Sequence, residues 1–382
     1  MRDDAAFAAL EFAFDRNALA PGATAIVFDA EVAPVLSRWP TPVCIQSWKP
    51  AYDGLVAGGV TARPVPDDGD LGFVVALVRL GRNRTVNRAL IATAARHLAD
   101  DGTLIVVGEN RFGPANYARE LGVGNVIVKH KARVFWLTAK QAGSIPALDD
   151  WSSAIDLQTF AGHPYRTAPG LFGWDRIDPG SELLARHLPN EIRGRVADLG
   201  AGWGYLAIEV LRGGAGVMEL DLYEADWRAL EAARVNVVAG QDGRIATQDD
   251  SVVAGQASAI ALQDDVALSH VPPRPTGGPA IGFHWHDVTR GLPCGGYDWI
   301  VTNPPFHDPR DADPELGRRF IRAAADALVD GGRLLLVANR SLPYESVLAE
   351  RFRRVTKIVE SEGYKVLCAT RGRIHQTREG NS

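Results

Sequence analysis

Short apolar runs alternate with amphipathic stretches through residues 1–140 of the chain. Runs of this kind are typical of strands that are buried on both faces of a parallel sheet. A stretch at 84–98 instead carries its apolar positions at helical spacing, and 131–137 has the pattern of a closing strand. The four apolar runs lie at 25–28, 43–45, 73–78 and 104–107. The pattern therefore predicts an α/β domain in this part of the chain.

The same order of elements returns in the second half. Residues 101–107 match 331–337, and 133–136 parallel 364–367. We interpret the repeat as two tandem Rossmann-like domains, each with a mostly parallel sheet, helices on both faces and an antiparallel final strand.

Composition divides the chain further. A stretch at 141–170 is rich in Pro, Gly and Ser and predicts a linker between a first domain at 1–140 and a second at 171–382. Within the second domain, the segment 241–279 is rich in Gly, Gln, Asp and Pro. Its apolar residues follow neither the spacing of a strand nor that of a helix, so the segment is expected to be an insertion.

An apolar run in the second domain ends in the sequence Asn303, Pro304, Pro305 and Phe306. The two prolines fix a stiff turn and have no N–H to donate. The turn therefore presents two acceptors, the Asn303 side-chain oxygen and the Pro304 carbonyl, beside an aromatic ring. Such a site suits a planar group with an exocyclic amine. The alternative is a proline-capped strand end with a buried Phe306.

A glycine-rich turn follows an earlier strand of the same domain. Asp198 precedes Gly200, Gly202 and Gly204, and a helical pattern begins directly after them. Glycines at a strand-to-helix turn allow a ligand to approach the backbone closely. Their spacing differs from that of dinucleotide-binding enzymes and disfavours a dehydrogenase. Glu224 ends the next strand, where a carboxylate can accept both hydroxyls of a ribose.

The ordered set of glycine turn, acid and Asn-Pro-Pro-Phe resembles the class I S-adenosylmethionine-dependent methyltransferases. Segments at 169–172, 337–339 and 342–344 narrow the resemblance to the RsmC-like, tandem-domain family of ribosomal RNA guanine-N2 methyltransferases. The resemblance covers nearly the whole chain. It implies S-adenosyl-L-methionine as cofactor, 16S ribosomal RNA or the small ribosomal subunit as partner, a cytoplasmic location and a monomer.

The resemblance also implies roles for single residues. Asp198 is expected near the methionine amino group of the cofactor, and Asp287 beside the adenine amino group. Phe306 is expected to stack on the target base. Phe172 is expected to fold over cofactor or base, or else to serve as a hydrophobic staple. The expected cofactor-binding residues are Asp198, Gly200, Gly202, Gly204, Glu224, Asp287, Val288 and Asn303. The expected catalytic residues are Asn303, Pro304, Pro305 and Phe306.

The first domain lacks both motifs. Asp29, Ala30 and Glu31 stand where the glycine turn would follow Phe28, and residues 78–81 replace Asn-Pro-Pro-Phe. We expect a degenerate domain that has kept the fold and lost the chemistry.

Charge suggests a use for the first domain. Residues 79–140 carry 11 basic and 4 acidic side chains, whereas the whole chain has a net charge of −5. This segment is predicted to contact RNA phosphates, with Arg82, Arg84 and Arg88 among the contacts. The alternative is a solvated helix face with scattered basic residues.

Other signals exclude or leave open several classes. The N-terminus lacks the features of a signal peptide, and the chain has no run of about 18 apolar residues that would span a membrane. The three cysteines are widely spaced, which indicates a reducing compartment. His284 and His286 have no further ligand pair, so no metal is expected.

Ser181 is expected to cap a helix. An adenine-N6 or glutamine-N5 methyltransferase, or a non-catalytic RNA-binding protein, remain alternatives.

Overall fold

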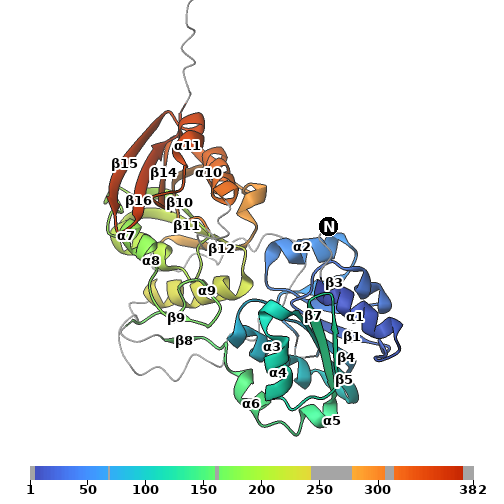
Figure 1. Cartoon of the computed structure of the whole chain (residues 1–382). Helices are drawn as coiled ribbons and strands as arrows, with labels where there is room; N and C mark the ends of the chain where they lie inside the picture. Colours follow the sequence, from blue (N-terminus) through green and yellow to red (C-terminus); the bar gives the residue numbers. More distant parts are fainter. Residues whose placement is uncertain (1–4, 68, 160–162, 242–277, 306–313, 373–382) are drawn as a thin grey trace, which may run out of the picture. The chain divides into compact units, whose positions relative to one another are not determined.

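The computed structural model describes residues 5–67, 69–159, 163–241, 278–305 and 314–372 (Figure 1). The chain divides into two compact units, 1–157 with 168–170, and 158–167 with 171–382. The segment expected to be a linker contains helix α6 (Ala147–Ser152) and a small hairpin of β8 (Gln158–Thr159) and β9 (Arg166–Thr167). The expected insertion lies almost wholly outside the described residues.

The first unit is built on a seven-stranded sheet in the order β3-β2-β1-β4-β5-β7-β6. Its first five strands are parallel, whereas β7 pairs antiparallel with both β5 and the edge strand β6. The strands are β1 (Ala25–Phe28), β2 (Val43–Ile45), β3 (Thr61–Arg63), β4 (Phe73–Arg79), β5 (Leu98–Glu109), β6 (Val126–Lys129) and β7 (Ala132–Thr138). The helices are α1 (Ala5–Asp15), α2 (Lys49–Ala57), α3 (Arg84–Arg96), α4 (Pro114–Glu120) and α5 (Ala139–Ala142), besides α6, with short 3-10 turns η1 (Pro34–Arg38) and η2 (Asn110–Phe112).

Both faces of this sheet are buried, as the apolar runs predicted. In β1, Val27 belongs to a core cluster that includes Leu10 of α1. The next residue along, Phe28, belongs to a second cluster that includes Ile91 of α3. Successive side chains point to opposite faces of a strand, so a strand between two helical layers is apolar at every position.

The second unit repeats this arrangement in the order β12-β11-β10-β13-β14-β16-β15. The strands are β10 (Arg193–Leu199), β11 (Gly216–Glu224), β12 (Ala280–Trp285), β13 (Tyr297–Thr302), β14 (Leu328–Asn339), β15 (Arg354–Ser361) and β16 (Tyr364–Thr370). The helices are α7 (Pro179–Ala185), α8 (Tyr205–Gly213), α9 (Trp227–Gln241), α10 (Pro314–Ala327) and α11 (Glu345–Arg351), with the 3-10 turn η3 (Val288–Arg290). The predicted fold class, two tandem Rossmann-like domains, is confirmed.

The sheets differ from the sequence-based expectation in one respect. The predicted antiparallel closing strand is present in each sheet, as β7 and β16, but a further strand that was not predicted pairs antiparallel with it. The additional strand, β6 or β15, lies at the edge of its sheet. In β15 the side chains are exposed or only half-buried, so the strand carries no apolar run. Among the described residues, no helix is long and apolar enough to cross a membrane.

Strand order reverses between β10 and β13, which are parallel neighbours although two strands and their connections separate them in the chain. In open α/β sheets, ligands bind at the carboxyl ends of the strands where the order reverses. The fold therefore places the ends of β10 and β13, and the residues that follow them, at the expected position for a binding site.

Candidate active site

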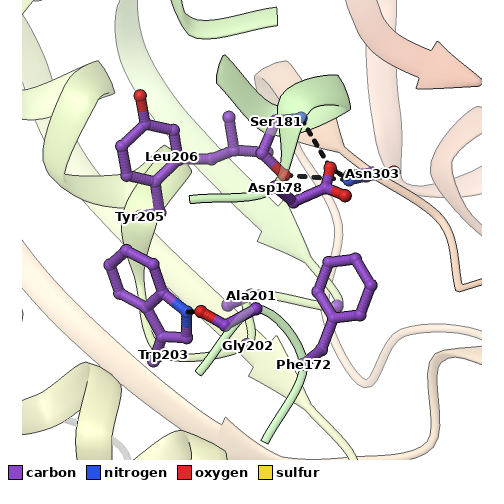
Figure 2. A pocket seen from close by; sticks show the side chains of 11 residues that line it. Phe172, Asp178, Ser181, Ala201, Gly202, Trp203, Tyr205, Leu206 and Asn303 are labelled. Atoms are coloured by element: carbon purple, nitrogen blue, oxygen red, sulfur yellow. Dashed lines mark hydrogen bonds between the residues drawn. The ribbon is translucent and has the colours of Figure 1, made fainter. Parts of the chain in front are cut away.

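A cleft lies at this edge of the second sheet (Figure 2). Its lining includes Gly200 and Gly202 from the turn after β10, and Asn303 from the end of β13. Three of the residues expected to hold the cofactor thus meet in one place. The full lining is Phe172, Gly173, Asp178, Ser181, Gly200, Ala201, Gly202, Trp203, Tyr205, Leu206 and Asn303.

The glycine turn uses left-handed backbone geometry throughout. Gly200, Gly202 and Gly204 have φ values of 71°, 55° and 91°. A Cβ atom at Gly202 would meet nothing within 4 Å, whereas one at Gly204 would lie 3.2 Å from Ala233 of α9. Gly202 therefore leaves open space at the cleft, and Gly204 allows the turn to pack against a helix.

Glu224 holds the glycine turn in place. One carboxylate oxygen accepts the N–H of Gly202 at 2.8 Å, and the other accepts the N–H groups of Ala225 and Asp226, each at 2.8 Å. Burial raises the pKa of Glu224 to about 7, although these backbone donors lower it. The acid expected to bind a ribose thus also shapes the backbone around the cofactor site.

Asp198 is fully buried at the end of β10. Neither of its carboxylate oxygens has a hydrogen-bond partner among the described residues. Burial raises the pKa of Asp198 to about 8, and the backbone of Ala207 in the first turn of α8 only partly offsets this. A buried carboxylate without a partner is costly, so a cationic group that binds nearby would be strongly favoured.

The amide nitrogen of Asn303 is held by two side chains at the start of α7. Its Nδ2 donates to Asp178 Oδ2 at 2.9 Å and to Ser181 Oγ at 2.8 Å (Figure 2). Its Oδ1 is buried and has no partner among the described residues. The Asn303 oxygen is thus available as an acceptor, as the motif predicted. Phe306, the other end of the motif, lies outside the described residues.

Asp178 and Ser181 were missed as members of the site. They lie 125 and 122 positions before Asn303, so no local sequence signal connects them to it. The expected role of Ser181 was also wrong. Asp178 is the N-cap of α7 and accepts the Ser181 N–H at 2.9 Å, which leaves the Ser181 hydroxyl free to bind Asn303. Proline at the first helical position makes the preceding residue the natural cap.

Aromatic side chains form the walls of the cleft. Figure 2 shows Phe172 on the opposite side of the cleft from Trp203 and Tyr205. The Phe172 side chain is 60% exposed, which a hydrophobic staple packed under a linker would not be. Trp203 Nε1 donates to the Gly173 carbonyl at 3.2 Å and so ties the Phe172 loop to the glycine turn. Tyr165 of the β8–β9 hairpin packs on Trp203 with ring centroids 5.1 Å apart.

Asp287 and Val288 follow β12, two strands from β10. Asp287 Oδ1 accepts the Thr289 N–H at 2.9 Å and its hydroxyl at 2.6 Å, and so caps η3. Neither Asp287 nor Val288 lines the cleft as the described residues define it. His284 Nε2 donates to Asp221 Oδ1 at 2.9 Å, and the described residues contain no cluster of ligands that fits a metal ion.

The matching positions in the first unit carry a different set of residues. Strand pairing aligns Phe28 with Val78 there, and Leu199 with Thr302 in the second unit. Arg79 therefore stands at the position of Asn303, and Asp29 and Glu31 at those of Gly200 and Gly202. Arg79 forms ion pairs with Asp29 at 3.4 Å and Glu31 at 3.0 Å.

The first unit still retains traces of the ligand-binding turn. Asp29 has a φ of 53°, close to that of the glycines, although it has a side chain. Gln46 stands at the position of Glu224 and accepts the Trp48 N–H at 2.9 Å, as Glu224 accepts that of Asp226. The first unit thus keeps part of the backbone shape of the turn, and an ion pair stands at the positions that carry Asn303 and the glycines in the second unit.

The three basic residues predicted to contact RNA belong to this first unit. Arg84 and Arg88 on α3 both pair with Glu120 of α4. The Arg88 guanidinium also lies 5.1 Å from the Trp151 ring centre. Arg82 is exposed in the loop before α3. Two of the three side chains therefore have a structural role besides any contact with RNA.

The second unit combines a glycine turn, buried acids and an Asn-Pro-Pro turn at the switch point of its sheet, the features that carried the resemblance to class I methyltransferases. The model of the methyltransferase small domain family matches residues 163–262 and 256–368, more than half of the chain. The chain belongs to this family, which confirms the class of enzyme predicted from the motifs.

Curated relatives extend the similarity over most of the chain. The Ribosomal RNA small subunit methyltransferase C of Shewanella loihica is 26% identical over 292 residues, 75% of this chain and 73% of the relative. That of Shewanella piezotolerans is 29% identical over 301 residues, 77% and 76% of the two chains. The solved T. thermophilus 16S rRNA N2 G1207 methyltransferase, in complex with AdoMet and guanosine, has a TM-score of 0.69 at 23% identity. That match covers 97% of this chain and 92% of the other.

Proposed function

We propose that this protein transfers a methyl group from S-adenosyl-L-methionine to the exocyclic N2 amine of a guanine in 16S ribosomal RNA. The observation that carries the proposal is the Asn303 oxygen, which is buried, unpartnered and directed by two fixed contacts of the same amide. The names of the relatives, all small-subunit methyltransferases, support ribosomal RNA as the substrate class.

The residues around the cleft fit S-adenosylmethionine. Asp198 supplies two unpartnered carboxylate oxygens, which suit the methionine ammonium group. Gly202 leaves open space where the methionine and ribose parts of the cofactor would lie. Glu224, at the end of the next strand, would accept the ribose hydroxyls, and Asp287 with Val288 would contact the adenine. The bound cofactor supplies a methyl group on a sulfonium, whose sulfur keeps the bonding electron pair when the methyl is transferred.

The acceptor atoms would orient the guanine amine. Asn303 Oδ1 and the Pro304 carbonyl each accept one amine hydrogen, which directs the nitrogen lone pair at the methyl group. As the new N–C bond forms, positive charge develops on the nitrogen, and the same two oxygens stabilise it. The nitrogen then releases one proton to solvent. Pro305 stiffens the turn, and Phe306 and Phe172 are proposed to stack on the unpaired base.

The first unit is proposed to hold the RNA. Its segment 79–140 has a large excess of basic residues, and it contains no intact cofactor motif. Arg82, Arg84 and Arg88 are proposed contacts with phosphate. All residues of the proposed catalytic site come from one unit of one chain, which supports a monomer. Ribosomal RNA as the proposed substrate supports a cytoplasmic location.

The test is mass spectrometry of modified nucleosides. Ribosomal RNA from a strain that lacks this protein should miss one N2-methylguanosine, and the purified protein with S-adenosylmethionine should restore it. Free 16S RNA and assembled small subunits should be tried in parallel. Restored N6-methyladenosine would instead identify an adenine-N6 methyltransferase. Transfer of a labelled methyl group from S-adenosylmethionine only into protein fractions would identify a glutamine-N5 methyltransferase.

A further inference from the structure

We propose that Asp178 and Ser181 are positioning residues that fix which atom of the Asn303 amide faces the substrate. The inference rests on the proposed function, because it concerns how the acceptor for the amine is held. Asp178 and Ser181 lie at the start of α7, and Asn303 follows β13. Neither residue belongs to the motifs found in the sequence.

The contacts use both hydrogens of the amide. Asn303 Nδ2 donates one to Asp178 Oδ2 and the other to Ser181 Oγ, at 2.9 and 2.8 Å. An amide nitrogen has two hydrogens to donate, so the group has no further donor to offer. Its remaining polar atom is Oδ1, which is the buried and unpartnered one. The amide atom left for the substrate is therefore the acceptor Oδ1, which an amine substrate requires.

A flipped amide would be strongly disfavoured. Rotation by half a turn would bring the Asn303 oxygen against the Asp178 carboxylate, and the NH2 group would face the incoming amine. The Asn303 oxygen and Asp178 Oδ2, both acceptors, would then meet, and two donors would face each other in the cleft, which leaves polar groups without partners. The Ser181 hydroxyl can donate as well as accept, so Asp178 sets the orientation and Ser181 supports it. Donation to a carboxylate also polarises the amide and increases the negative charge on its oxygen. That oxygen becomes a better acceptor as charge develops on the amine.

The site at the start of α7 is itself held firmly. Asp178 Oδ2 also accepts the Ser181 N–H at 2.9 Å, so one oxygen caps the helix and binds Asn303. Gly180 allows this close approach, because a Cβ there would lie 3.0 Å from Asp178 Oδ2 and 2.9 Å from the Tyr364 ring. Tyr364 belongs to β16, so the sheet supports the cap from behind.

The test compares turnover and cofactor affinity in full-length variants, with 16S RNA from the deletion strain and tritiated S-adenosylmethionine. Asp178→Ala should lower kcat by about 10²-fold, the scale of a small misplacement in a catalytic site. Ser181→Ala removes one of two contacts and should lower kcat by about tenfold or less. Cofactor affinity should not change in either. Asp175→Ala removes an exposed acid from the same loop and should leave kcat unchanged.

Two further variants separate positioning from a structural role. Asp178→Asn keeps a capping oxygen and should restore most of the kcat lost in Asp178→Ala. In an Asn303→Ala background, Asp178→Ala should cause no further loss of kcat, because its effect passes through the amide. If Asp178→Ala fails to fold, Ser181→Ala in the two backgrounds makes the same comparison.

Two results would overturn the inference while leaving the proposed function in place. One is an inactive Asn303→Ala together with near-normal kcat in both Asp178→Ala and Ser181→Ala. The other is full additivity of Asp178→Ala with Asn303→Ala. Normal turnover in Asn303→Ala would instead show that the proposed function itself is wrong.

Discussion

Arg79 and Asp29 form an ion pair, 3.4 Å between their nearest atoms, at the positions that Asn303 and Gly200 occupy in the second unit. An arginine side chain and a carboxylate now fill the place where the second unit keeps an amide and an open turn. Glu31 pairs with the same arginine at 3.0 Å, so two carboxylates of the first unit neutralise the Arg79 guanidinium. At the position of the Asn303 amide, the first unit therefore presents an ion-paired guanidinium, which donates hydrogen bonds and cannot accept them.

The first prediction concerns the number of cofactor sites. Calorimetry on the full-length protein should give one S-adenosylmethionine per chain, bound in the second unit. Gly202→Val should abolish all measurable binding, because a side chain there would fill the open space of the turn. Residual binding in the folded Gly202→Val variant would reveal a second site and contradict the hypothesis that the first unit has lost the cofactor site.

The second prediction concerns the acceptor turn. Asn303→Ala should lower methyl transfer by at least about 10²-fold, the scale of losing a hydrogen bond made in the transition state. Cofactor affinity should change little, since the proposed role of the amide is toward the amine. Single-turnover kinetics with saturating cofactor measures this. Turnover close to that of the unmodified protein would argue against the assignment of Asn303.

The third prediction separates two glycines of one turn. Alanine at either position must adopt positive φ, which costs about 1–2 kcal/mol. Gly204→Ala should destabilise the protein more than Gly202→Ala, because its Cβ would also crowd Ala233 at 3.2 Å. Gly202→Ala should instead weaken cofactor binding. Thermal unfolding and calorimetry of both variants check this, and equal effects on stability would count against it.

The fourth prediction concerns pH. Burial raises the pKa of Asp198 to about 8, far above its value in the unfolded chain. The folded state therefore favours the protonated form, so this contribution to stability is fully present below about pH 4 and is lost as pH rises toward 8. Asp198→Asn cannot ionise, so the difference in unfolding temperature between this variant and the unmodified protein, without cofactor, should shift in favour of the variant as pH rises from 4 to 8.

Cofactor binding provides the control for this experiment. Asp198→Asn should bind S-adenosylmethionine more weakly, because the amide cannot pair with the methionine ammonium as a carboxylate does. Glu224, whose pKa is raised to about 7, still titrates in the variant, so some pH dependence should remain. A difference in unfolding temperature that does not shift with pH would show that Asp198 is not an unpaired charge.

The fifth prediction concerns RNA binding by the first unit. Reversal of Arg82, Arg84 and Arg88 to Glu should weaken RNA binding and reduce its salt dependence, by roughly one unit of slope for each lost phosphate contact. Since Arg84 and Arg88 both pair with Glu120, the variant should also carry Glu120→Lys, which preserves the pairing with inverted charges. Cofactor affinity should stay unchanged. Unaltered RNA affinity and salt slope in this folded variant would identify the segment as a solvated face.

Much of the fold could be predicted from the sequence. The run at 25–28 is β1, and the helix expected at 84–98 is α3, which ends at Arg96 because Leu98 already begins β5. Such elements follow from local pattern, since a strand between two helical layers must be apolar at every position. The strand β15 could not be found in this way, because an edge strand exposes most of its side chains to solvent.

The sequence by itself determined which residues are candidates for the site. Asn303, the glycine turn and Glu224 each stand in a short motif whose residue types suit a ligand, and parallel strands must bring their ends to one edge. Only the tertiary structure decided how those groups are held. Asp178 and Ser181 reach Asn303 across more than 120 positions of chain, and Arg79 meets Asp29 across 50. Contacts of this length depend on how the strands are ordered and how helices pack on them, and no local pattern of residues encodes that.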